Sequence, residues 1–155
     1  MVRRCNQRGL SLIELIVAFT ILLILTSMAV PLARSKVRSQ KERELRYALR
    51  EIRRAIDTYK DATLAGKIDV KLGTEGYPES LDILVQGVKL SQSPDGKTIK
   101  FLRRIPKDPM TGTYDWGKRS MQDDPKSQSW GGQNVFDVYT KSEGTALDDS
   151  KYKDW

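Results

Sequence analysis

The chain of 155 residues contains no histidine and only one cysteine, Cys5. The absence of histidine excludes catalysis by a histidine paired with serine or cysteine, and it excludes histidine metal sites. A single cysteine forms neither an intrachain disulfide nor a cysteine-rich zinc site. The sequence also lacks a glycine-rich phosphate-binding loop and a recognisable pair of catalytic acids. Together these absences argue against an enzyme.

The net charge of +7 is concentrated in one part of the chain. Residues 34–60 hold ten basic and four acidic side chains, whereas residues 61–155 are close to neutral. A nucleic-acid site would therefore have to lie within 34–60. We favour a solvated helix face there, or one that contacts acidic neighbouring subunits and lipid headgroups, and we do not expect nucleic acid as a partner. The arginines concerned are Arg43, Arg46, Arg50, Arg53 and Arg54.

A long apolar run extends from Leu10 to Ala33, and Glu14 is its only ionisable residue. As a helix the run is roughly 36 Å long, enough to cross a hydrocarbon core. Three arginines in residues 1–9 favour a cytoplasmic N-terminus. A cleavable secretory signal is disfavoured, because the run is too long and no small-x-small cleavage site follows it. The run therefore predicts a membrane-spanning helix over 10–33, bent near Pro31 because proline removes a helical hydrogen bond.

Glu14 is unusual, because a carboxylate inside a membrane segment is costly without a partner. It either stays solvated at headgroup depth or pairs with a positive group on another chain. Gly9 lies just before the apolar run, where its flexible backbone is accessible to a protease.

Beyond Pro31 the sequence predicts a basic amphipathic helix over 34–65 that ends at Gly66. The remaining residues, 66–155, contain short candidate strands at 98–105, 114–116 and 134–140, separated by long loops. We therefore expect an α+β fold, in which one long N-terminal helix packs through its second half on a small antiparallel sheet. The predicted buried stripe of this helix consists of Leu45, Ala48, Leu49, Ile52, Ala55, Ile56, Tyr59 and Ala62.

The segment Arg8-Gly9-Leu10-Ser11-Leu12-Ile13-Glu14 resembles the class III signal of type IV pilins and pseudopilins. The resemblance implies that a prepilin peptidase cleaves after Gly9 and methylates the new N-terminus at Leu10. It also implies that Glu14 neutralises the N-terminal amine of an adjacent subunit in a filament, and that Pro31 is the helix-bending proline of the family. The expected organisation is a cleaved leader at 1–9, a filament-core helix at 10–33, the basic helix at 34–65 and a globular part at 66–155.

Other pieces are similar to the major (G-type) pseudopilin of type II secretion systems, namely Tyr77-Pro78, the turn Pro106-Lys107-Asp108-Pro109 and Trp155. This implies a structural subunit of the bacterial inner membrane, with a periplasmic C-terminal part, that polymerises into a pseudopilus and drives protein export. The implied partners are further copies, minor pseudopilins, the prepilin peptidase, the inner-membrane assembly platform and the lipid bilayer. The alternative is a type IV pilus-type pilin or minor pilin used for adhesion or DNA uptake.

The same resemblance implies a calcium ion in the C-terminal loop. Asp148, Asp149 and Asp154 offer the oxygen ligands that a hard cation requires. Lys151 and Lys153 lie among them, and a plain solvated acidic loop is the alternative.

Overall fold

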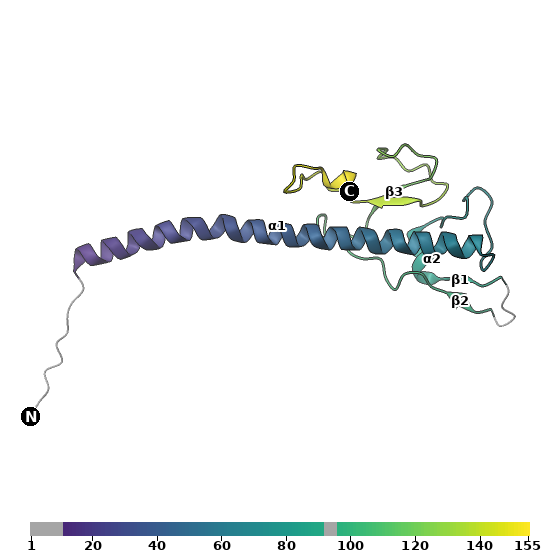
Figure 1. Cartoon of the computed structure of the whole chain (residues 1–155), viewed down its shortest axis with the longest axis horizontal. Coiled ribbons are helices and arrows are strands. Elements are labelled where there is room, and N and C mark those ends of the chain that lie inside the picture. Colours follow the sequence, from purple (N-terminus) through teal and green to yellow (C-terminus); the bar gives the residue numbers. More distant parts are fainter. Residues whose placement is uncertain (1–10, 92–95) are drawn as a thin grey trace, which may run out of the picture. The chain divides into compact units, whose positions relative to one another are not determined.

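The computed structural model describes residues 11–91 and 96–155, and for 28–33 it describes the helical backbone alone. It confirms the predicted α+β class, with one long helix followed by small antiparallel sheets (Figure 1). By their contacts the residues form two units, one ending at Ser39 and one spanning Gln40–Trp155. The elements are α1 (Leu12–Leu64), α2 (Leu81–Gln86), β1 (Val88–Lys89), β2 (Thr98–Ile99), β3 (Gly117–Arg119), β4 (Asp137–Tyr139) and the 3-10 turn η1 (Tyr152–Asp154).

Helix α1 is 53 residues long and ends where the sequence predicts. Gly66 adopts a φ of 65°, a left-handed conformation that favours glycine. Its N–H donates to the Thr63 carbonyl, and the Lys67 N–H donates to the Ala62 carbonyl. These two bonds form a Schellman motif, which satisfies the last carbonyls of the helix.

The helical backbone of α1 continues through Pro31. The side chain of Pro31 lies outside the described residues, so the bend predicted there stays a prediction. Within the part of the chain that the structure describes, no helix contains a stretch long and apolar enough to cross a membrane. The predicted span of 10–33 includes Leu10 and the side chains of 28–33, which lie outside that description.

The core of the second unit is built on the predicted apolar stripe of α1, and all eight of its residues are buried. They recur at spacings of three and four, which places them on one side of the helix. Burying each leucine or isoleucine contributes about 1.5–3 kcal/mol. The residues that complete this core from the rest of the unit are Ile68, Leu81, Leu84, Leu102, Trp116, Val135, Val138, Ala146 and Tyr152.

The strands are shorter than the sequence predicts, and they form two separate two-stranded sheets rather than one. β1 pairs with β2 and β3 pairs with β4, both antiparallel. The strand predicted at 98–105 ends at Ile99, because the N–H groups of Phe101 and Leu102 both donate to the Leu84 carbonyl of α2. The backbone hydrogen bonds of this segment therefore go to a helix end instead of a neighbouring strand.

Candidate functional site

The N-terminal half of α1 has no core of its own in the described structure. Every residue from Ser11 to Ser27 is exposed, and Leu12 and Leu23 are 77% and 69% exposed. Exposed apolar patches of this extent are typical of surfaces that contact a membrane or another protein. The large side chains concerned are Leu12, Ile13, Leu15, Ile16, Val17, Phe19, Ile21, Leu22, Leu23, Ile24 and Leu25.

Three hydroxyl groups in this segment are satisfied by the helix itself. Thr20 donates to the Val17 carbonyl at 2.8 Å, and Thr26 donates to the Leu22 carbonyl at 2.7 Å. Ser27 donates to the Ile24 carbonyl at 2.9 Å. Because these groups need no external partner, the segment is suited to apolar surroundings, in which an unsatisfied polar group is costly.

Glu14 lies in the first turn of α1 and is exposed. Its backbone N–H donates to the Ser11 carbonyl at 3.1 Å, which starts the helix. The positive end of the helix dipole favours a carboxylate at this position. Among the described residues the side chain has no hydrogen-bond or ion-pair partner, so its predicted partner on another chain stays a prediction. Gly9 and Leu10, the predicted processing residues, lie outside the described residues.

The second unit carries a clamp, which we define as the contacts of Glu42, Arg46 and Arg53 on α1 with residues 144–155. Glu42 accepts hydrogen bonds from the Leu147 N–H and the Tyr152 hydroxyl, both at 2.9 Å. The Arg46 guanidinium lies 4.0 Å from the centroid of the Trp155 ring. Cation–π contacts of this kind are attractive. The clamp thus fixes the C-terminal segment to the helix.

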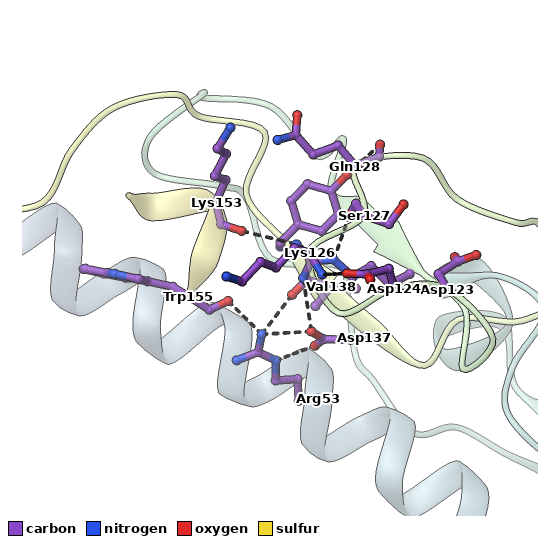
Figure 2. Close-up of polar contacts among 12 residues, drawn as sticks. Arg53, Asp123, Asp124, Lys126, Ser127, Gln128, Asp137, Val138, Lys153 and Trp155 are labelled. Atoms are coloured by element: carbon purple, nitrogen blue, oxygen red, sulfur yellow. Dashed lines mark hydrogen bonds and ion pairs between the residues drawn. The ribbon is translucent and has the colours of Figure 1, made fainter. Parts of the chain in front are cut away.

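Arg53 joins α1 to both β4 and the C-terminal segment (Figure 2). Its Nε lies 2.6 Å from Asp137 Oδ1, and its Nη2 donates to the Val138 carbonyl at 3.1 Å and to the backbone oxygen of Trp155 at 2.8 Å. Arg119 of β3 forms a second ion pair with Asp137, with Nη1 3.5 Å from Oδ2. One carboxylate therefore pairs with two arginines, and the planar guanidinium of Arg53 donates to acceptors on three residues.

These contacts revise the interpretation of the basic helix. Arg46 and Arg53 are occupied within the chain, so they do not belong to a free basic face. The sequence contained one signal for this, because Arg53 directly follows the buried Ile52 at the border of the apolar stripe. Its partners lie 84 to 102 residues further along the chain, and no local pattern identifies them.

The predicted calcium ligands are not brought together. Within residues 11–91 and 96–155, no three His, Cys, Asp or Glu side chains gather as ligands for a metal ion. Asp148 Oδ1 instead accepts two hydrogen bonds from Ser150, from N at 3.1 Å and from Oγ at 2.5 Å. These bonds lower the pKa of Asp148, and Arg46, 3.5 Å from Oδ2, lowers it further. This arrangement favours the alternative, a plain solvated acidic loop, over a calcium ion held by Asp148, Asp149 and Asp154, and calcium binding there stays a prediction.

We expect calcium to leave the melting temperature of the chain unchanged, because Arg46 and Ser150 already supply positive charge and hydrogen bonds to Asp148. Thermal melting followed by circular dichroism, with added calcium and with a chelator, measures this. Magnesium serves as the matched control ion. A melting temperature that rises with calcium alone would support a calcium site in this loop instead.

Residues 4–30 match the family model of the prokaryotic N-terminal methylation motif. The matched range contains Gly9, Leu10 and Glu14, together with the exposed apolar part of α1 up to Ser27. The motif indicates a type IV pilin-like protein of the prepilin type. No curated protein and no solved structure matches the chain.

Proposed function

We propose that the chain is a structural subunit of a type II secretion pseudopilus. In this proposal the prepilin peptidase cleaves after Gly9 and methylates Leu10, and the mature chain then polymerises through the first half of α1. The observation that carries the proposal is the coincidence of the methylation motif with an apolar helix whose residues from Leu12 to Ser27 are all exposed. Exposure of so many apolar side chains to water is unfavourable. A bilayer, or other copies of the chain, would remove this surface from water.

The proposed path runs from the inner membrane to the periplasm. Single chains reside in the inner membrane with a cytoplasmic N-terminus, and the basic leader favours this orientation. The inner-membrane assembly platform adds them to a filament, together with minor pseudopilins, and the growing filament drives folded proteins across the outer membrane. The role is structural and requires no catalytic group of this chain.

Two features favour a pseudopilin over a pilus-type pilin for adhesion or DNA uptake. Residues 10–155 contain no cysteine, so no disulfide closes the C-terminal loop. The clamp from Glu42, Arg46 and Arg53 holds that loop instead. Deletion of the gene separates the two functions, because we expect loss of exoprotein secretion with normal adhesion and DNA uptake. The reverse pattern would favour the pilus subunit.

We expect the protein extracted from membranes to have lost residues 1–9 and gained one methyl group. Intact-mass spectrometry of the purified full chain measures both changes at once. The matched control is Gly9→Val, whose branched side chain hinders protease access to the backbone, so it retains the leader. Recovery of the wild-type chain with an intact leader would contradict the proposed processing.

A further inference from the structure

The outer face of α1 in the second unit carries a charged stripe of four residues, Arg50, Arg54, Asp57 and Asp61. All four are exposed, and they lie on the side of the helix away from the buried stripe. The two arginines come first along the helix and the two aspartates follow. The face is therefore divided into a basic half and an acidic half.

Arg54 and Asp57 lie three residues apart, but within the described part of the chain neither half of the charged stripe forms an ion pair. Among the described residues, none of the four side chains has a hydrogen-bond or ion-pair partner. Arg43 lies further toward the N-terminus and already has an interaction of its own. Like charges four residues apart repel one another and destabilise a helix. The arginine pair and the aspartate pair both have this spacing, so each gains from an outside partner of opposite charge.

We propose that the charged stripe is a docking surface for α1 of a second copy of this chain, parallel to the first and displaced by seven residues. Arg50 and Asp57 are seven residues apart, and so are Arg54 and Asp61. One displacement, about 10.5 Å along the axis, therefore brings both arginines beside both aspartates of the neighbour. Because the two halves differ, the contact is head-to-tail and continues from copy to copy.

The parallel orientation rests on the proposed function, since chains that insert through the same N-terminal helix point the same way. In an antiparallel pair of helices the ion pairs would be different, because Arg50 would lie beside Asp61 and Arg54 beside Asp57. Such a pair is a closed dimer, to which no third copy can be added through the same surface. The two arrangements thus differ in their residue pairs and in the size of the assembly, and both differences are measurable.

Charge reversal tests the pairing in the full-length chain. We expect Arg50→Glu with Arg54→Glu to raise the critical concentration for filament assembly about tenfold, because two ion pairs become two repulsions. Asp57→Arg with Asp61→Arg has the same effect. The fourfold variant that combines them restores assembly to within about twofold of wild type, as a charge exchange requires. The matched control reverses two exposed lysines elsewhere, Lys97→Glu and Lys100→Glu, and assembles normally.

Cysteine cross-linking tests the register in a Cys5→Ser background. Residues 50 and 57 of one helix are about 10.5 Å apart, too far for a disulfide, so a bond between them joins two chains. We expect Arg50→Cys with Asp57→Cys to give a ladder of covalent multimers on oxidation of intact filaments. Absence of this ladder would contradict the proposed displacement of seven residues. A discrete dimer from Arg54→Cys with Asp57→Cys, without the ladder, establishes the antiparallel pair and also overturns it.

These experiments distinguish a failure of the proposed docking surface from a failure of the proposed function. If wild-type filaments form while both charge-reversed variants assemble normally, the docking surface is wrong and the filament subunit stands. If the wild-type chain never polymerises after cleavage, the proposed function itself fails. Circular dichroism of each variant in detergent confirms that the reversals leave the helix folded.

Discussion

Replacing Glu14 by alanine is expected to abolish filament formation while cleavage after Gly9 continues. Glu14 is the only ionisable side chain among residues 12–27, and no described residue partners it. In the proposed filament it neutralises the N-terminal amine of Leu10 on an adjacent copy. Removing one member of a buried ion pair costs about 3–5 kcal/mol, because the other charge stays buried without a partner. That cost weakens assembly about a hundredfold or more.

The measurement is filament yield after shearing, with membrane-extracted protein analysed by mass to verify cleavage. Glu14→Gln preserves the shape and removes the charge, so we expect it to fail as well, whereas Glu14→Asp retains part of the yield. The matched control is Glu143→Ala, an exposed glutamate of the second unit. Normal yield from Glu14→Ala would remove the assembly role of this carboxylate.

Replacing Asp108 by alanine is expected to destabilise the second unit by about 3 kcal/mol. Asp108 is fully buried, and its carboxylate accepts three hydrogen bonds. The donors are Met110 N at 2.8 Å, Thr111 Oγ1 at 3.0 Å and Thr140 Oγ1 at 2.5 Å. Alanine removes the acceptor of all three donors, and Thr140 is itself fully buried. The turn that follows Pro106 would then lose its attachment to the end of β4.

Thermal melting of the full chain, followed by near-ultraviolet circular dichroism, measures this change. The buried Trp116 reports on the region, because its Nε1 donates to the Pro106 carbonyl at 2.9 Å. Asp108→Asn keeps one acceptor oxygen and is expected to cost less than alanine. Asp115→Ala is the matched control, since Asp115 is exposed and its ion pair with Lys141 is worth less than about 1 kcal/mol. A melting temperature for Asp108→Ala equal to that of the control would contradict the prediction.

The helical parts of the fold were predictable from the sequence because their signals are local. Spacings of three and four identify the stripe from Leu45 to Ala62, and Gly66 marks the end of α1. The two-residue and three-residue strands were not predictable in their extent. Segments so short have little periodicity, and the partners of Phe101 and Leu102 at α2 decide where β2 ends.

The functional features were likewise predictable from the sequence only where their signal is local. The methylation motif is contiguous, so the resemblance alone predicts roles for Gly9, Leu10 and Glu14; the family match covers these residues, and their roles stay predictions. The clamp joins residues about a hundred positions apart, such as Glu42 and Tyr152, and no local pattern reveals such pairs. For the same reason the sequence suggested calcium ligands at Asp148, whose bonds to Ser150 and ion pair with Arg46 appear only in the folded chain.

The position of Arg53 has a mechanical consequence. Its guanidinium contacts the side chain of Asp137, the backbone of β4 and the backbone of the last residue at the same time. Tension applied along α1 is therefore shared by the hydrogen bonds of Arg53 to Asp137, Val138 and Trp155. All of these bonds must break before β4 can separate from the helix at this residue. In the proposed filament, a load that reaches the second unit through α1 would act on these bonds of Arg53.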